Sequence, residues 1–477
     1  MSSRAAFRYA EGTSVCSSGR RSTPPLLNAE GQTKKEEVKE LLKTNAHLKV
    51  LLFAVGLLTV VSSRAGEDGI IEIRKNPQPQ TSDVVVLSGP VIITNLFGDI
   101  RNRNIGAHNI RVVCPGYCQR EEALMRALRW LKKNQQPDGS WPQQKIAMTG
   151  LAILTFLAHG EPPRDSREFG ATVQKALEFL LKNQRADGKF NGMDDGEYAH
   201  PIATYALCEA YGMTLNPDVK AAAEKALVPI IKGQHPTGGW TYKMHPGPEA
   251  NGGFRDDTSF MGWCVQALKA AHLAKIQVNG LERAMKLAVK GFKANAHPSG
   301  GFGYIGPGTG GLTSVGCLCM QLLGASNENE VKKALDVIDT WVPTFSSYAS
   351  APEEERRFYM MASPQYYFYY ATQCKFHQGG RHWDNWNKAM KPRYVKAQLV
   401  EENAIKDAKG IDRDIGWWEN ADAHSDRPVM DTCLAALQLM VYYRYLPTTR
   451  KEAVMVGGEA VTPPFDTDDI PIDTGSL

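Results

Sequence analysis

The sequence predicts an all-α protein in which helix pairs repeat around a ring, each pair having one outer and one inner helix. Two observations support this prediction. A Gln-x-x-x-Gly-x-aromatic segment recurs at similar intervals, and such a repeat indicates a repeated structural unit. Each copy also separates an amphipathic stretch from a stretch that is apolar on all sides, as expected for a surface helix followed by a buried helix.

The composition is that of a globular protein and limits its partners. Hydrophobic residues make up 43% of the 477 residues and charged residues 22%, which is ordinary for a chain with a large core. The net charge of +4 is small for this length, and no dense run of Lys or Arg occurs. Nucleic-acid binding therefore has no electrostatic support, and no nucleic-acid partner is expected.

The N-terminal part is expected to lie outside the ring. Residues 1–46 are polar, which predicts disorder. Residues 47–65 combine Lys49, an apolar run over residues 50–61 and a small-residue stretch, as a signal peptide or a short membrane anchor does. A buried helix of the folded domain is the alternative. We expect an exported or membrane-anchored protein of the periplasm or cell envelope, with an N-terminus able to associate with a membrane.

Two further segments flank the repeats. Residues 66–119 contain short β-like runs broken by Pro, Gly and Asn, which predicts a linker with a short β-hairpin. Cys114 and Cys118 flank a turn in this linker and can form a disulfide if the protein is exported; with no second Cys/His pair nearby, we do not expect a structural zinc site. Residues 448–477 are rich in Pro and Asp and are predicted to form a disordered tail.

Three well-formed copies of the repeat begin at Gln135, Gln184 and Gln234, and a decayed copy begins at Ala296. The glutamine amide can bond exposed backbone groups of adjacent helices. The glycine four residues later supplies the positive φ that ends the outer helix and turns the chain. These glycines are Gly139, Gly188 and Gly238. We interpret the repeat residues as structural rather than catalytic.

The stretches on either side of the loops predict six helix pairs over residues 120–447. The outer helices show apolar residues at i, i+3, i+4 and i+7, as at Leu124, Ala127, Leu128 and Leu131. The predicted inner helices cover residues 146–158, 200–213, 258–268, 312–323, 364–374 and 429–440. A closed ring leaves no end that needs a capping repeat. Six of the nine cysteines lie in apolar helical stretches and are expected to be small core residues.

The Gln-x-x-x-Gly-x-Trp segment after an outer helix resembles the repeat of squalene and oxidosqualene cyclases. The β-subunits of protein prenyltransferases are built from the same ring. This resemblance implies an (α/α)6 toroid with a central cavity. Residues 257–263 and 441–446 are also similar to exported single-toroid proteins of some bacteria that carry squalene-cyclase or prenyltransferase repeats.

The resemblance also implies a candidate acid. Cyclases of this class protonate an alkene with the middle Asp of an Asp-x-Asp-Asp-Thr motif, and the nearest match runs from Phe254 to Thr258. Asp256 falls on the acid position and Asp257 on the third position, whereas Phe254 replaces the first Asp. Arg255 favours ionised carboxylates and opposes proton donation. The alternative is that one of the two Asp residues caps the following helix.

Aromatic residues gather in the hairpin loops and at the starts of the inner helices. Their faces can stabilise a carbocation, and they are equally common in protein cores. We predict a substrate-binding set that consists of Trp240, Tyr242, Phe260, Trp263, Phe302, Tyr304, Trp417 and Trp418. Tyr366, Tyr367, Tyr369 and Tyr370 are further candidates for the same rim.

Two functional hypotheses remain open. The first is a class II type isoprenoid cyclase, an isomerase or lyase, that uses Asp256 in a central apolar cavity. The second is a non-catalytic extracytoplasmic ring that binds a lipid, a peptide or a glycan. No metal or other cofactor is expected: Asp431 and Cys433 have the spacing of two prenyltransferase zinc ligands, but no His follows them.

Overall fold

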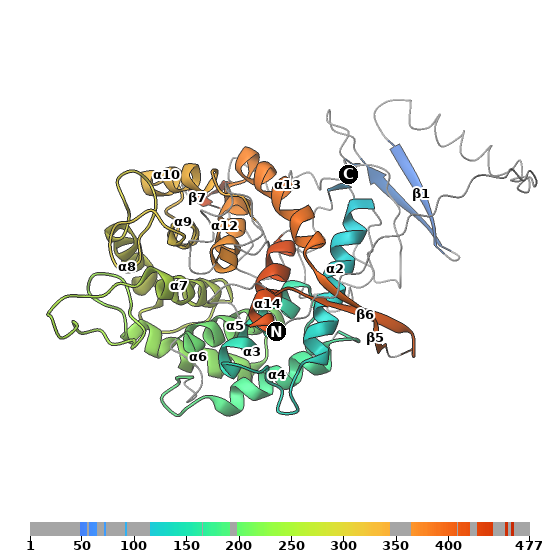
Figure 1. Cartoon of the computed structure of the whole chain (residues 1–477), viewed down its shortest axis with the longest axis horizontal. Helices are drawn as coiled ribbons and strands as arrows, with labels where there is room; N and C mark the ends of the chain where they lie inside the picture. The colour runs from blue at the N-terminus through green and yellow to red at the C-terminus, as the bar shows by residue number, and fades with distance from the viewer. Residues whose placement is uncertain are drawn as a thin grey trace, which may run out of the picture.

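The computed structural model describes residues 115–164, 166–190, 198–343, 364–407, 409–419 and 427–441, together with short strands near both ends of the chain (Figure 1). These residues contain twelve α-helices. The terminal strands are β1 (Leu48–Ala54) and β2 (Leu57–Ser63), β3 (Ile71–Glu72) and β4 (Val91–Ile92), and β7 (Val454–Val456) and β8 (Glu459–Val461). The pairs β1–β2 and β7–β8 are antiparallel, and β3–β4 is parallel.

Several predictions for the ends of the chain fall outside this region. Residues 1–46, Cys114 and most of residues 448–477 lie outside the described residues. Cys118 does not follow a turn, because the first described helix already begins at Pro115. Among the described residues, no helix combines the length and the apolar character needed to cross a lipid bilayer.

Six helices form a closed inner ring. Each contacts the next along the chain, and the last contacts the first; in Figure 1 the red α14 lies beside α3. Their side chains are almost all buried, which explains why their sequences lack an exposed polar face. These helices are α3 (Lys145–Ala158), α5 (Ala199–Thr214), α7 (Thr258–Leu273), α9 (Leu312–Leu322), α12 (Pro364–Gln378) and α14 (Pro428–Leu439).

Six further helices pack around this inner ring, one before each inner helix along the chain. Their buried residues lie on one stripe, for example Val173, Ala176, Leu177 and Leu180 in the second outer helix. The outer helices are α2 (Pro115–Lys133), α4 (Gly170–Asn183), α6 (Pro217–Lys232), α8 (Leu281–Ala294), α10 (Asn329–Ile338) and α13 (Gly380–Lys396). The contacts of the two rings confirm the predicted (α/α)6 toroid.

The repeat glutamines link each outer helix to the next. Gln135 Nε2 donates one hydrogen bond to Gly139 O in its own loop and another to Thr172 O in α4, both at 2.9 Å. Gln184 makes the same pair of bonds to Gly188 O and Ala222 O, and Gln234 makes them to Gly238 O and Ala284 O. The structural role predicted for the repeat is therefore confirmed.

The sixth helix pair also has a copy of the repeat, but an insertion divides it, and for this reason the copy was not recognised in the sequence. The antiparallel hairpin of β5 (Leu399–Lys406) and β6 (Asp412–Trp417) separates Gln398 from Gly416 and Trp418. Gln398 Nε2 donates to Ala123 O in α2 at 2.7 Å, so it links the last outer helix to the first. Trp418 Nε1 donates to Tyr394 O, four residues before Gln398, as Trp240 Nε1 donates to Ile230 O, four residues before Gln234.

The buried His159 holds the first outer helix against the end of the first inner helix. Its Nδ1 lies 2.9 Å from Glu161 Oε1, and its Nε2 lies 3.1 Å from Glu121 Oε1 in α2. Burial alone would lower the pKa of His159, but the hydrogen bonds and charges of the two carboxylates outweigh burial and raise it from 6.5 to about 9. The imidazolium is therefore the stable form at neutral pH.

The glycine of the second repeat tests how tightly its loop packs. A Cβ on Gly188 would lie 2.3 Å from Lys225 O, whereas Gly252 has a similar φ of +80° and no atom within 4 Å. We expect Gly188→Ala to lower the free energy of unfolding by about 3 kcal/mol or more, and Gly252→Ala by about 1 kcal/mol. Urea denaturation measures both. Equal losses would show that backbone conformation, rather than packing, requires the glycine.

The His159 pair predicts a loss of stability at alkaline pH. The folded pKa exceeds the unfolded value, so this contribution is fully present below pH 6.5 and is lost as the pH rises through about 9. Melting temperatures between pH 6.5 and 9.5 should fall more steeply for the wild type than for His159→Gln. The exposed His245 offers the control, since His245→Gln should follow the wild-type slope. A wild-type slope in His159→Gln would contradict the assignment.

Candidate functional site

The start of α7 separates the two acidic residues of the candidate motif. Asp257 is the N-cap of α7, and its Oδ1 accepts hydrogen bonds from the backbone N–H groups of Ser259 and Phe260 at 3.1 and 3.3 Å. Its Oδ2 lies 3.4 Å from a guanidinium nitrogen of Arg255. Asp257 is fully buried. The helix-cap alternative therefore describes Asp257, and the arginine pairs with this carboxylate.

Asp256 has a different environment. Its Oδ1 lies 2.7 Å from His235 Nδ1, and its backbone carbonyl accepts a hydrogen bond from the Asn295 amide at 2.8 Å. Both His235 and Asp256 are buried. Gly239 makes room for the carboxylate, since a Cβ at that position would lie 2.4 Å from Asp256 Cγ. Asp256 is thus held by a histidine in the repeat loop and does not cap its helix.

His235 contributes a second feature to this pair. Its Nε2 is buried and has no hydrogen-bond partner among the described residues. The ring of Phe254 lies 5.3 Å from the imidazole ring, measured between centroids. Phe254 therefore packs against the histidine that holds Asp256. A buried polar atom without a partner is costly, so the unpaired Nε2 of His235 needs an explanation, of which a role in a site is one.

A chain of tyrosine hydroxyls crosses the rim beside this pair. Tyr242 OH lies 2.6 Å from Tyr304 OH and 3.2 Å from Tyr198 OH, and Tyr198 OH lies 2.7 Å from Ser259 Oγ. Arg255 donates to Tyr304 OH at 2.8 Å, and its guanidinium carbon lies 5.1 Å from the Tyr304 ring centroid. We call Tyr198, Tyr242, Tyr304 and Arg255 the rim network.

Burial keeps the hydroxyls of the rim network protonated. It raises the pKa of Tyr198 to about 12, and it also raises the pKa values of Tyr242 and Tyr304. At neutral pH these side chains therefore act as neutral hydrogen-bond donors and acceptors. Arg255 is the cation of the network.

Aromatic side chains of α7 and α12 meet inside the ring, although α9 lies between these helices in the ring order. Trp263 stacks on Tyr369 with 5.8 Å between centroids and 19° between planes. Gln266 accepts a hydrogen bond from Tyr369 OH at 3.0 Å and donates one to Tyr370 OH at 2.9 Å. Aromatic groups therefore pack together beside α7, and the hydroxyls of Tyr369 and Tyr370 are hydrogen-bonded there.

The predicted aromatic residues fall into two groups. Tyr242, Phe260, Trp263 and Tyr304 lie in the rim network or next to it along α7, where Phe260 packs edge-on against Tyr242 at 5.6 Å. The other four lie elsewhere. Trp240 and Trp418 donate to carbonyls of outer helices, Phe302 packs on Phe292 of α8, and Trp417 stacks on Trp130 of α2 at 6.1 Å. These four belong to the packing between outer and inner helices and to the seam of the ring.

Sequence reasoning did not select His235. It follows the repeat glutamine, at the position where the first two copies carry Gln136 and Arg185. This change of residue type in the third copy was the one sequence signal that could have marked it as a site residue. The signal is ambiguous, because His297 holds the same position in the fourth copy and its Nδ1 lies 2.6 Å from Ser299 Oγ instead. Only the approach of Asp256 distinguishes the two histidines.

The described residues contain no group of three or more His, Cys, Asp or Glu side chains arranged to hold a metal ion. Asp431 and Cys433 are buried in α14, and burial raises the pKa of the Cys433 thiol to about 12. The six cysteines of the inner helices are reduced and buried. Their predicted role as small core residues is confirmed.

Comparison with known proteins gives limited similarity. No protein-family model matches the chain. Drimenyl diphosphate synthase from Streptomyces showdoensis is 31% identical over 136 residues, which are 27% of this chain and 24% of that protein. The chain therefore matches about a quarter of the length of this relative. The likeness is local, and it does not extend to the whole of either protein.

Two solved structures illustrate the structural similarity. The type II terpene cyclase MstE from Scytonema has a TM-score of 0.43 and 12% identity, and the match covers 69% of this chain and 100% of that one. An α-1,6-mannanase of Salegentibacter has a TM-score of 0.45 and 10% identity, over 68% of this chain and 98% of that one. The toroid assignment rests on the helix contacts of the chain itself.

The cap at Asp257 predicts a stability effect with an internal comparison. Asp257→Ala removes the acceptor for two backbone N–H groups and leaves Arg255 unpaired, so it should lower the free energy of unfolding by about 2 kcal/mol. Asp257→Asn retains a capping oxygen and should cost less. Asn216 caps α6 at an exposed position, and Asn216→Ala should cost about 1 kcal/mol. Equal losses for Asp257→Asn and Asp257→Ala in urea denaturation would assign the effect to the ion pair.

Proposed function

We propose that this chain is a terpenoid-cyclase-like enzyme that acts on an apolar isoprenoid, with Asp256 as the general acid. The proposal depends on the different environments of Asp256 and Asp257. Arg255, which would oppose proton donation, pairs with Asp257, and the helix start also binds Asp257. Asp256 remains buried against His235. The local similarity to drimenyl diphosphate synthase supports the same class of chemistry.

In the proposed reaction Asp256 transfers its carboxyl proton to one carbon of an alkene. The π electrons form the new C–H bond, and the neighbouring carbon becomes a carbocation. A hydrogen bond from His235 Nδ1–H stabilises the carboxylate that is left behind. Attack by a further alkene of the same chain closes a ring. Solvent water then accepts a proton from carbon, and solvent returns a proton to Asp256, so that atoms and charge balance.

The surrounding side chains fit the later steps of this reaction. Aromatic faces supply negative electrostatic potential for a carbocation, and Phe260 and Trp263 lie next to the rim network, packed against Tyr242 and Tyr369. The rim network supplies hydrogen-bond donors for a polar head group, with Arg255 as its cation. The name of the sequence relative includes a diphosphate, and a guanidinium suits such a group.

Product formation from linear isoprenoids tests the acid role. The purified full chain is incubated with farnesyl diphosphate, geranylgeranyl diphosphate or squalene, and products are identified by gas chromatography and mass spectrometry. Asp256→Asn should reduce product formation at least about 100-fold, as expected for loss of a general acid. His235→Gln should reduce it less, because the donor to the carboxylate is weakened but the acid remains.

An exposed carboxylate provides the matched control. Asp187 lies on the surface of the second repeat loop, and Asp187→Asn should retain wild-type product formation. Circular dichroism establishes that each variant is folded. Wild-type activity in Asp256→Asn would refute the acid role. Recovery of an unmodified lipid, a peptide or a glycan from a protein that forms no product would favour the binding ring, for which Phe254 in place of an Asp is the supporting feature.

A further inference from the structure

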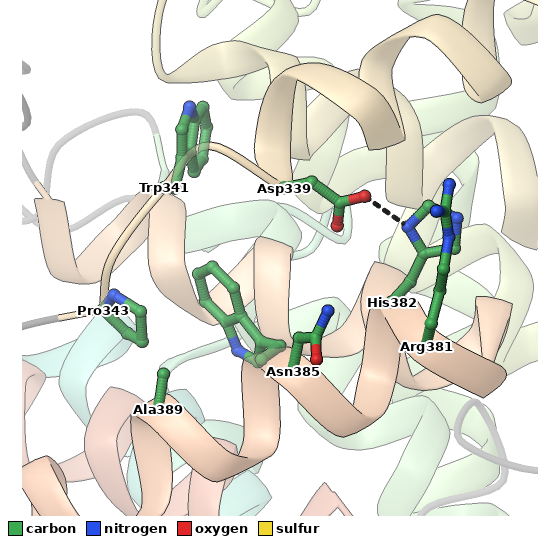
Figure 2. A pocket seen from close by; sticks show the side chains of 8 residues that line it. Asp339, Trp341, Pro343, Arg381, His382, Asn385 and Ala389 are labelled. Carbon is green, nitrogen blue, oxygen red and sulfur yellow. Dashed lines mark ion pairs between the residues drawn. The ribbon is translucent and has the colours of Figure 1, made fainter.

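A pocket of about 140 Å³ lies on the outer side of the ring, between α13 and the segment that follows α10. Figure 2 shows its lining. Asp339 and Trp341 come from the segment after α10, and the remaining polar residues come from one face of α13. This site is not the one described above, because it is formed by outer helices, and nothing in the proposed cyclase reaction uses it.

The two ends of the pocket differ in chemistry. Trp341, Pro343 and Trp386 form an apolar end, and both indole rings are fixed from behind by edge contacts with Phe368 at 6.5 and 5.9 Å. Trp386 Nε1 donates to Thr372 Oγ1 at 2.9 Å. Because its one donor is satisfied, the indole presents only apolar surface to the pocket.

The other end carries an available cation. Arg381 and Asn385 line the pocket, both are exposed, and neither forms an ion pair or a side-chain hydrogen bond with another described residue. In Figure 2, Arg381 stands beside His382 at the end of the pocket opposite Pro343. Arg381 and Asn385 are four positions apart, so about one turn of α13 brings the guanidinium and the amide onto one face.

Among the described residues, Asp339 is the only carboxylate that lines this pocket, and its charge is already neutralised. Asp339 pairs with Lys375, which is fully buried, and with His382 Nδ1 at 2.8 Å. Burial alone would raise the pKa of Asp339, but the hydrogen bond from Lys375 and the nearby His382 lower it. The Asp339 charge is thus balanced by its own partners, and no carboxylate of the described residues compensates the positive charge of Arg381.

We propose that this pocket binds a small planar carboxylate, with its ring between Trp341 and Trp386 and its carboxylate on Arg381 and Asn385. The volume suits this class, since a cavity of about 150 Å³ holds one benzene-sized ring. A guanidinium binds a carboxylate through two parallel N–H···O bonds, and the Asn385 amide adds a third donor. A cationic ligand would meet the uncompensated Arg381 instead.

Binding of benzoate to the full chain tests this proposal. Saturation-transfer NMR and tryptophan fluorescence should show saturable binding with a dissociation constant on the order of 1 mM or below. Arg381→Gln should weaken binding at least about tenfold, because a charge-assisted bond is lost. Ala389→Leu places bulk at the apolar end and should weaken binding by a separate, steric route without changing the charge.

Matched controls make the result specific. Arg283 is an exposed arginine of α8, and Arg283→Gln should bind benzoate like the wild type. Methyl benzoate keeps the ring but lacks the charge, so it should bind at least about tenfold more weakly than benzoate. The proposal is overturned if benzoate binding does not saturate, or if Arg283→Gln and Arg381→Gln lose affinity for benzoate equally. It is also overturned if a neutral ligand binds more tightly than benzoate, whether methyl benzoate or the uncharged sugar methyl glucoside. None of these outcomes depends on cyclase activity.

Discussion

The hydrogen bonds of the repeat glutamines hold neighbouring helix pairs in register. Gln135, Gln184 and Gln234 each donate one hydrogen bond to their own loop and one to the next outer helix, as Gln234 does to Gly238 O and Ala284 O. The bond from Gln398 to Ala123 repeats this link across the seam between the last and the first pair. The ring is therefore closed by the same interaction that propagates it.

This link also shapes the candidate site. Gln234 fixes the loop that carries His235 and Gly239, and the packing of Gly238 against α8 leaves no room for a side chain at that point. The loop consequently delivers an imidazole to Asp256 while Gly239 accommodates the carboxylate. A scaffold contact that serves only stability in the first two repeats thus positions a polar group in the third.

The two carboxylates show how adjacent residues acquire different roles. Successive side chains at a helix start point in different directions, so Asp257 reaches the free N–H groups of α7 and Asp256 reaches back to the loop. Arg255 forms an ion pair with Asp257 and donates a hydrogen bond to the hydroxyl of Tyr304. The positive charge of Arg255, which is close in sequence to both acids, is therefore paired with Asp257 and not with Asp256.

The sequence by itself determined the scaffold, because helix periodicity, apolar inner stretches and repeat glycines are local features that the chain displays directly. It also named the acidic pair and, among the eight predicted aromatic residues, the four that the structure brings together at the start of α7 or along it. Tertiary structure decided the rest. The pairing of His235 with Asp256, the meeting of Trp263 with Tyr369 and the link from Gln398 to Ala123 each join residues that are distant in the chain. The last was hidden by the β5–β6 hairpin, which separates Gln398 from Gly416 and Trp418 and removes the spacing on which recognition of the repeat depends.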